Sequence, residues 1–383
     1  MAGQSFERVR KAALRLHKEH QGKFAVASKV PLRGPADLKL IYTPGVGAVS
    51  SYLAKHPAEL QNYTMKGNSV AVVSDGSAVL GLGNLGPEGA LPVMEGKCLL
   101  FKKFANIDAV PIVLATQHIG EIVRTVLAIA PAFGGVNLED ISAPRCFEVE
   151  ARLKRKLSIP VMHDDQHGTA IIVLAGLLNA LKVVRKQLER VKIVINGAGA
   201  AGTATAKLLR KAGARTIVMC DRHGIIYRNR RGLASYKREL ARLTNPKQER
   251  GDLAAAMRHA DVFIGVSGPN LVSKAMVNSM ERDAIVFALA NPIPEIMPDL
   301  AKRAGARVVA TGRSDFPNQL NNSLVFPGVF RGALDNGVRA ITDKMKLKAA
   351  RTIADLVPRP TRTKIVPGMF DPRVVPAVAE VIR

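Results

Sequence analysis

Hydrophobic and polar residues recur along the chain with two periods, which together predict a mixture of strands and helices. Short runs rich in Val, Ile and Ala predict strands that are buried on both faces. Between these runs, longer segments place apolar residues three and four positions apart, as one face of a helix requires. Strands and helices alternate along most of the sequence, and this alternation predicts an α/β fold with parallel sheets.

The predicted elements can be placed by residue number. Helices are expected at 5–20, 92–104, 119–130, 145–157, 169–188 and 203–212. Strands are expected at 69–73, 109–115, 136–138, 159–163, 191–195, 216–220, 262–266, 284–289 and 307–310. Residues 23–47 are expected to form strand and loop. The last segment is expected to be helical from residue 341 and proline-rich from Pro358.

The length and the pattern predict two domains and a tail. A chain of 383 residues is long enough for two or three domains. We predict an N-terminal α/β domain that holds the substrate and the catalytic groups over 1–158. A Rossmann domain with a doubly wound parallel sheet is predicted over 159–340, and a helical and extended tail over 341–383.

A glycine-rich turn between a predicted strand and a predicted helix indicates dinucleotide binding. It consists of Gly197, Gly199 and Gly202 in the spacing GxGxxG, directly after the β-branched run 191–195. In this motif the first glycine allows the tight turn and the second lets the backbone approach a pyrophosphate. The third lets the helix pack close to the strand, with its N-terminus facing the phosphates.

The acid that follows this motif bears on the choice between NAD and NADP. Asp221 ends the next predicted strand, about 20 residues after the glycines, where a carboxylate accepts from the ribose 2′-hydroxyl of NAD and repels a 2′-phosphate. Arg222 and His223 follow at once and can offset that repulsion. The sequence therefore predicts NAD or NADP as cofactor, and Asp221 favours NAD.

Two pairs of acidic residues follow predicted strands and form a candidate metal site. They are Glu139-Asp140 and Asp164-Asp165. Ligands of open α/β sheets bind at the carboxyl ends of the strands, and oxygen ligands favour Mg²⁺ or Mn²⁺. Neighbouring residues of a strand point to opposite faces, so both acids of a pair can reach one ion only where the chain leaves regular geometry. The alternative is that Asp140 and Asp165 cap helices.

The chain carries a large excess of positive charge. Its 56 basic and 31 acidic residues give a net charge of +25, which attracts polyanions at low salt. However, the basic clusters at 154–156 and 228–231 have no interleaved aromatic residues to stack on bases. We therefore do not expect a nucleic-acid partner.

Cysteine usage and the first residues bear on the compartment. Three widely spaced cysteines without a zinc pattern indicate a reducing compartment, and we expect a cytoplasmic protein. The first 20 residues contain Glu7 and Glu19 and no apolar core, which does not suit a secretion signal. The apolar stretch 169–184 is interrupted by Asn179 and Lys182, so we expect a buried helix and no membrane partner.

Seven segments in a fixed order resemble the malic enzymes, especially their compact bacterial and archaeal type. The resemblance runs from about residue 12 to 380. The segments are Tyr42–Val46, Ser74–Gly83, Pro92–Lys97, Phe133–Ile141, Asp164–Thr169, the glycine turn and Asn321–Val329.

This resemblance implies a reaction and its principal residues. Malic enzymes decarboxylate L-malate oxidatively to pyruvate and CO₂, with reduction of NAD(P)⁺ and a requirement for a divalent cation. In the family pattern the metal ligands fall on Glu139, Asp140 and Asp165. Lys97 matches the lysine that takes the proton of the malate hydroxyl, and Tyr42 matches the residue that protonates the enolpyruvate carbon.

The resemblance also assigns binding residues, and it shows one departure. Asn291 and Asn321 match positions that hold the substrate and the nicotinamide amide, and Ser267 lies where the adenosine side of the cofactor usually sits. Larger members carry a substrate-binding arginine where this chain has Ala78-Val79-Leu80. We therefore expect the Ser77 hydroxyl and backbone amides of the loop 81–89 to hold the malate C4 carboxylate.

Several alternatives remain open at this point. The chain could be another 2-hydroxy-acid or amino-acid dehydrogenase, a malolactic enzyme, or a non-catalytic protein that binds dinucleotides or polyanions. Tyr42 could be a turn aromatic, Lys97 a solvated helix residue and Asn321 a cap. The family implies a homodimer or homotetramer, in which the catalytic tyrosine and lysine can come from a neighbouring subunit.

Overall fold

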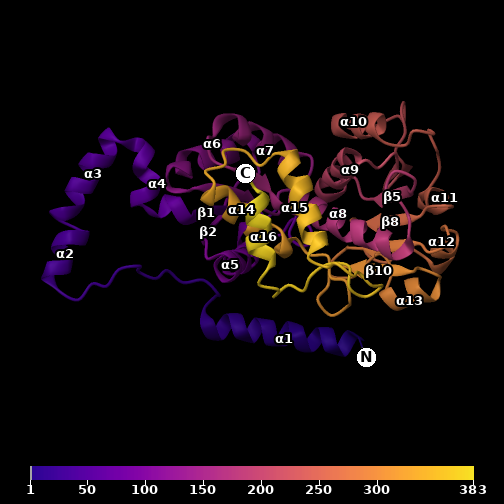
Figure 1. Ribbon diagram of the computed structural model, residues 1–383, viewed down its shortest axis with the longest axis horizontal. Coiled ribbons are helices and arrows are strands. Elements are labelled where there is room, and N and C mark those ends of the chain that lie inside the picture. Colours follow the sequence, from indigo (N-terminus) through magenta and orange to yellow (C-terminus); the bar gives the residue numbers. More distant parts are fainter. Residues whose placement is uncertain (1) are drawn as a thin grey trace.

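Two sheets, one in each half of the chain, organise the computed structural model, which describes residues 2–383 (Figure 1). The first sheet has four parallel strands in the order β2-β1-β3-β4. Its strands are β1 (Ser69–Ser74), β2 (Asp108–Val113), β3 (Gly135–Leu138) and β4 (Val161–His163). β1 and β3 are buried throughout, as their apolar sequences require.

The second sheet has six strands in the order β10-β9-β8-β5-β6-β7. Five of them are parallel, and the short β7 pairs antiparallel with β6. Its strands are β5 (Lys192–Asn196), β6 (Thr216–Asp221), β7 (Gly224–Ile225), β8 (Val262–Gly265), β9 (Ile285–Ala288) and β10 (Val308–Thr311). The order changes direction at β5, as in a doubly wound sheet, so the predicted α/β fold is confirmed.

Helices connect the strands of each sheet. In the first half they are α5 (Gly86–Ala105), α6 (Ile119–Ile129) and α7 (Arg145–Lys156), with the 3₁₀ turn η3 (Ala130–Ala132). In the second half they are α9 (Ala200–Ala212), α10 (Ser235–Leu243), α11 (Leu253–Met257), α12 (Lys274–Asn278) and α13 (Pro298–Arg303). The chain ends with η4 (Asn322–Leu324), α14 (Phe326–Asp335), α15 (Asp343–Asp355) and α16 (Val374–Val381).

One long helix, α8 (Asp164–Val184), lies between the two halves and packs against α9 and α15 (Figure 1). It belongs to the largest apolar cluster, which also includes side chains of both sheets. By length and composition α8 could cross a membrane, but 67% of its most apolar window is buried inside the protein. Its apolar sequence is therefore that of a core helix, as the interruptions at Asn179 and Lys182 indicated.

The first sheet extends further along the chain than the predicted first domain does. Strand β4, which we placed after the boundary at 158, pairs with β3 through Val161, Met162 and His163. Helix α8, which begins directly after β4, then leads to the second sheet. The domain limits themselves remain a prediction.

The segment before the first sheet differs from the prediction. We expected strand and loop over 23–47, but this part contains α2 (Pro35–Ile41) and the start of α3 (Gly45–Lys55) and has no strand. Pro35 begins α2, where the missing N–H costs nothing. The remaining elements before β1 are α1 (Ala2–His20), η1 (Pro57–Glu59), α4 (Leu60–Tyr63) and η2 (Met65–Asn68).

We call residues 2–63 the N-terminal arm. Figure 1 shows α2 and α3 standing away from both sheets, and α2, α3 and α4 contain no buried residue. Near its middle the arm contacts α5, where the Lys23 N–H donates to Glu95 Oε2 at 3.0 Å and Lys23 Nζ donates to the Pro92 carbonyl at 2.8 Å. Large exposed apolar side chains of the arm include Phe24, Val26, Val30, Leu32, Leu38, Leu40, Ile41, Tyr42, Tyr52 and Tyr63.

Candidate active site

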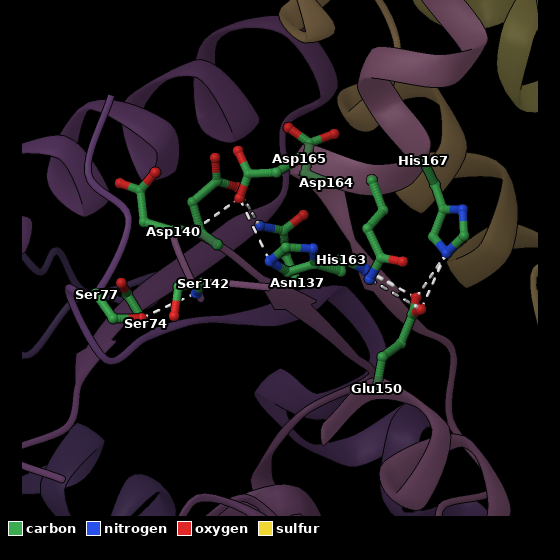
Figure 2. Close-up of polar contacts among 12 residues, drawn as sticks. Ser74, Ser77, Asn137, Asp140, Ser142, Glu150, His163, Asp164, Asp165 and His167 are labelled. Carbon is green, nitrogen blue, oxygen red and sulfur yellow. Dashed lines mark hydrogen bonds and ion pairs between the residues drawn. The ribbon is translucent and has the colours of Figure 1, made fainter. Parts of the chain in front are cut away.

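The carboxylates predicted to bind a metal meet at the carboxyl end of the first sheet. Oxygen atoms of Glu139, Asp140 and Asp165 all lie within 4.8 Å of one another. Asp140 has a left-handed backbone with φ of 54°, which is the departure from strand geometry that two neighbouring acids need to face one point. The Asp140 N–H also donates to Asp165 Oδ2 at 2.8 Å, which joins the β3 and β4 ends (Figure 2).

The helix-capping alternative for these acids is wrong. Helix α7 begins at Arg145 with Pro144 as its N-cap, five residues after Asp140 in the chain. Helix α8 begins at Asp164 with His163 as its N-cap, so Asp165 lies within the first helical turn. Both acids therefore project from the junctions between strand and helix and do not cap either helix.

Lys97 extends from α5 into this acidic cluster. Its Nζ atom lies 2.7 Å from Asp164 Oδ2 and 2.9 Å from Glu139 Oε1, and its side chain is only 8% exposed. The ammonium also lies 4.3 Å from the centroid of the Phe326 ring. Lys97 is thus a buried cation held by two carboxylates and an aromatic face, which excludes the solvated-helix alternative.

The buried charges of this cluster shift one another's proton affinities. Burial raises the pKa of Asp164 to about 7, although the Lys97 ammonium opposes the shift. Burial and the neighbouring carboxylates raise the pKa values of Glu139, Asp140 and Asp165, again against Lys97. For Lys97 burial alone would lower the pKa, but Asp164 and Glu139 raise it above its ordinary value. One cation is therefore too little positive charge for four carboxylates.

Glu150, on α7, contacts residues on both sides of the β4–α8 junction. It accepts from the His163 N–H at 3.0 Å, lies 2.9 Å from His167 Nε2 and pairs with Lys154 at 2.7 Å (Figure 2). The His163 ring in turn places Nε2 3.3 Å from Asp165 Oδ2. The two histidines thus contact carboxylates, and Glu150 fixes the turn from which Asp164 and Asp165 project.

Ser77 braces the loop that follows β1. Its hydroxyl donates to Asp75 Oδ1 at 2.6 Å and accepts from the Ser142 N–H at 2.9 Å. This contact joins the loop after β1 to the loop after β3, beside the metal candidates (Figure 2). Gly76 has φ of 66°, and a Cβ atom there would lie 2.0 Å from the Gly86 carbonyl oxygen, so only glycine fits this turn.

Four of the residues predicted to bind the dinucleotide line one cavity of about 760 Å³ at the second sheet. They are Gly197, Gly199, Asp221 and Ser267. A Cβ atom on Gly199 would meet nothing within 4 Å, so the backbone is open to a ligand there. A Cβ atom on Gly202 would lie 1.8 Å from the Gly197 carbonyl oxygen, which explains the third glycine by close packing. The glycine turn therefore fits a bound pyrophosphate.

Three other predicted residues lie outside both the acidic cluster and the dinucleotide cavity. Tyr42 follows α2 on the N-terminal arm and is 65% exposed. Asn321 caps η4 by accepting from the Ser323 N–H at 2.9 Å, as its cap alternative proposed. Asn291 lies on the loop after β9, where its carbonyl oxygen would be 2.5 Å from a Cβ atom on Gly81. That approach brings a loop of the second half against the glycine-rich loop of the first.

Two site residues were missed by the sequence analysis. Asp164 was noticed only as one of a pair of acids, although it is fully buried and makes the shortest contact to Lys97. Glu150 carried no signal beyond its place in an amphipathic helix. Its role depends on a contact between α7 and the start of α8, 13 residues further along the chain.

The fold and the site together define an enzyme with a Rossmann unit and a buried acidic centre at a second parallel sheet. Residues 21–154 match the family description "Malic enzyme, N-terminal domain". Residues 166–379 match the description "Malic enzyme, NAD binding domain". The chain therefore belongs to the malic enzyme family.

Individual relatives agree with this assignment. The chain is 54% identical to a bifunctional malic/malolactic enzyme of Bacillus subtilis, over 98% of this chain and 92% of that protein. It is 55% identical to an NAD-dependent malic enzyme of Geobacillus stearothermophilus, over 94% of this chain and 76% of that protein. The crystal structure of an NAD-dependent malic enzyme from Thermotoga maritima superposes with a TM-score of 0.94 at 48% identity, over 97% of this chain and 98% of that one.

Proposed function

We propose that this chain catalyses the oxidative decarboxylation of L-malate to pyruvate and CO₂, with reduction of NAD(P)⁺ and dependence on Mg²⁺ or Mn²⁺. The observation that carries the proposal is the convergence of Lys97 with Glu139, Asp140, Asp164 and Asp165 at the end of the first sheet. Belonging to the malic enzyme family supports the same reaction.

The donor set at this centre fits a hard divalent cation. Among the described residues, Asp140 Oδ2 and Asp164 Oδ1 are buried without a hydrogen-bond partner. Such orphaned oxygens cost free energy unless a proton or a cation satisfies them. Glu139, Asp140 and Asp165 would hold the ion through oxygen atoms alone. When bound, the ion supplies polarisation of the malate C2 hydroxyl and stabilisation of negative charge that develops during decarboxylation.

Lys97 is the residue we assign to the hydroxyl proton. In its present pairing the ammonium is stabilised by Glu139 and Asp164, so it keeps its own proton. Engagement of Glu139 as a metal ligand would remove one of these two stabilising charges and lower the pKa of Lys97. Lys97 could then accept the proton of the C2 hydroxyl while hydride passes to the nicotinamide, and Asp164 would keep its side chain oriented.

We assign protonation of the enolpyruvate carbon to Tyr42 of a second copy of the chain. Tyr42 is exposed on the N-terminal arm, whose helices α2 and α3 stand away from α5, the helix that carries Lys97 (Figure 1). The exposed apolar side chains of the arm need a cover, and an identical subunit provides one in a closed dimer. We therefore propose a homodimer, or a tetramer built from such dimers.

For the remaining groups we keep the roles that the family implies. Ser77 and the adjoining loop would hold the C4 carboxylate, and Asn291 and Asn321 would hold substrate and nicotinamide. The loop contact between Asn291 and Gly81 supports a substrate position between the two halves. We place the reaction in the cytoplasm, since Cys98, Cys146 and Cys220 are free and buried.

The reaction is tested by following formation of NAD(P)H with L-malate and Mn²⁺, and by identifying pyruvate as the product. We expect turnover that EDTA abolishes and added Mn²⁺ restores. Another 2-hydroxy-acid dehydrogenase without a metal centre would keep its activity in EDTA. Absence of turnover in folded protein that binds the dinucleotide would contradict the proposal.

The origin of Tyr42 is tested by mixing two inactive variants, Tyr42→Phe and Lys97→Ala, and letting their subunits exchange. If Tyr42 serves the site of its partner, a mixed dimer contains one site with both native residues and regains part of the activity. If Tyr42 serves its own chain, each site of the mixed dimer lacks one residue and no activity returns. Analytical ultracentrifugation of the same samples measures the dimer.

A further inference from the structure

A second cavity, of about 820 Å³, adjoins the dinucleotide cavity at the end of β6. The two cavities share Asp221, Arg222, Tyr236 and Lys237. In Rossmann units the residue that ends this second strand meets the adenosine ribose. The second cavity therefore begins where the 2′ position of a bound cofactor would be.

This cavity is strongly cationic. The side chains that line it include five with permanent positive charge and one carboxylate, that of Asp221. The cations come from the β6–β7 turn, from the segment before α10 and α10 itself, and from the loop before α11. They are Arg222, Arg230, Arg231, Lys237 and Arg250.

The charge of Asp221, which favoured NAD in the sequence, is already compensated. Asp221 Oδ2 accepts from Arg230 and, at 2.7 Å, from Lys237 Nζ, while Oδ1 accepts from the His223 N–H at 3.0 Å. Its side chain is only 6% exposed. Two cations around one carboxylate leave a net positive charge, so this group no longer repels a phosphate.

The remaining arginines are available to a ligand. Arg222, Arg231 and Arg250 are exposed, and none of them forms an ion pair within residues 2–383. The Arg250 guanidinium lies 4.8 Å from the centroid of the Tyr227 ring, which orients it without neutralising it. A guanidinium group can donate two parallel hydrogen bonds to the oxygens of one phosphate. A phosphate monoester carries close to two negative charges at neutral pH.

We propose that this cationic cavity binds the 2′-phosphate of NADP⁺ and makes NADP⁺ the preferred cofactor. The inference rests on the proposed function only in requiring a nicotinamide dinucleotide in the adjoining cavity. It reverses the preference for NAD that Asp221 alone indicated, because Arg230 and Lys237, 9 and 16 residues further on, compensate that acid.

The test measures binding of two cofactor fragments, ADP-ribose and 2′-phospho-ADP-ribose, by titration calorimetry without malate or metal. We expect the 2′-phosphate to tighten binding at least about ten-fold. The double variant Arg231→Ser/Arg250→Ser changes residues that line the cationic cavity and not the dinucleotide cavity, so it should remove most of that difference and leave ADP-ribose affinity within about two-fold. The control Arg228→Ser removes an exposed arginine of the same segment that does not line the cavity, and it should change neither affinity.

Two further arms make the test decisive. Asp221→Asn frees Arg230 and Lys237, so it should tighten 2′-phospho-ADP-ribose binding. Inorganic phosphate should weaken binding of 2′-phospho-ADP-ribose more than binding of ADP-ribose, because it competes for the cationic cavity as well as for the glycine turn. Equal affinity for the two fragments, or tighter binding of ADP-ribose, overturns the inference and leaves the reaction untouched. Failure of both fragments to bind overturns the dinucleotide proposal as well.

Discussion

The two candidate sites lie at equivalent edges of their sheets but handle charge in opposite ways. At the first sheet, four carboxylates surround Lys97, and three of them, with Lys97, are buried. At the second sheet, five cations line the cavity that contains Asp221, and three of those cations are exposed to water. Buried charge of one sign is unstable until a counter-charge arrives, whereas exposed charge is stabilised by water and only selects what binds. In the functions proposed above, the first site therefore determines the chemistry and the second the choice of cofactor.

The largest expected effect comes from breaking the acidic site at Lys97. We expect Lys97→Ala to lower kcat about a thousand-fold, because both the proton acceptor and the buried counter-charge are lost. Since the alanine variant leaves Glu139 and Asp164 unpaired, Lys97→Arg is measured beside it; it keeps the charge and should also lose activity. The control Lys103→Ala changes an exposed lysine of the same helix and should keep wild-type turnover.

A second change tests whether the acidic site depends on the contacts that Glu150 makes with the β4–α8 turn. Glu150→Gln weakens the hold on the β4–α8 turn, so the Mn²⁺ concentration for half-maximal activity should rise about ten-fold. Saturating Mn²⁺ should restore most of kcat, which a general loss of folding would not allow. Glu148→Gln, on the exposed side of α7 where it pairs with Arg152, serves as control. An unchanged Mn²⁺ requirement in Glu150→Gln would contradict the positioning role.

The pH dependence of the free energy of unfolding provides a further test of the difference between the buried acidic site and the exposed cationic cavity. A carboxyl group with a raised pKa binds its proton more tightly in the folded state, so stability falls as pH rises from the ordinary pKa toward the raised one. The buried acids therefore predict that metal-free protein melts a few degrees lower at about pH 8 than at about pH 6.5. Burial lowers the pKa values of His163 and His167 to about 4, so their contribution to stability rises with pH, but above about pH 6.5 it adds only about 0.4 kcal/mol per histidine.

Metal and one substitution give the controls for this melting experiment, followed by differential scanning calorimetry. Mn²⁺ should raise the melting temperature more at the higher pH, where its ligands are deprotonated. Asp140→Asn removes one buried acid and should reduce the fall in stability. A metal-free protein that is equally stable at both pH values would show that burial does not raise the pKa values of these carboxyl groups.

The smallest expected effect is the response to salt. Exposed cations are screened by added salt more than buried groups are. Raising the salt concentration should therefore weaken binding of 2′-phospho-ADP-ribose several-fold and change the Mn²⁺ requirement little. Both quantities can be measured in one series of KCl concentrations. If salt changed the Mn²⁺ requirement more than the binding of 2′-phospho-ADP-ribose, the contrast between a buried acidic site and an exposed cationic cavity would be contradicted.

Most of the fold could be predicted because its signals are local. The runs around β1, β5 and β6 are continuous and β-branched, and the glycine motif stands where a strand and a helix meet. The prediction failed at residues 23–47, where α2 and α3 bury no residue within the chain. A helix that buries no face within its own chain need not carry apolar residues at helical spacing, so the pattern did not predict these two helices.

The position of the acidic site was predictable from spacing, because Glu139-Asp140 and Asp164-Asp165 each follow a strand and parallel strands end at one edge. The choice of Glu139, Asp140 and Asp165 as metal ligands came from the resemblance to malic enzymes and stays a prediction. The contacts of Asp164 with Lys97 and of Asp221 with Lys237 were not predictable, because each joins residues on different elements. The preference for NAD that Asp221 indicated is subject to the same limit, because Arg230 and Lys237, which pair with that acid, lie outside the motif.

The left-handed backbone of Asp140 places two selective pressures in opposition. A non-glycine residue at φ of 54° is strained, and glycine would relieve both that strain and one buried charge. If Asp140 holds the ion as proposed, drift toward a more robust fold at this position would discard a metal ligand, so a lineage that abandoned malate oxidation would be expected to lose Asp140 early.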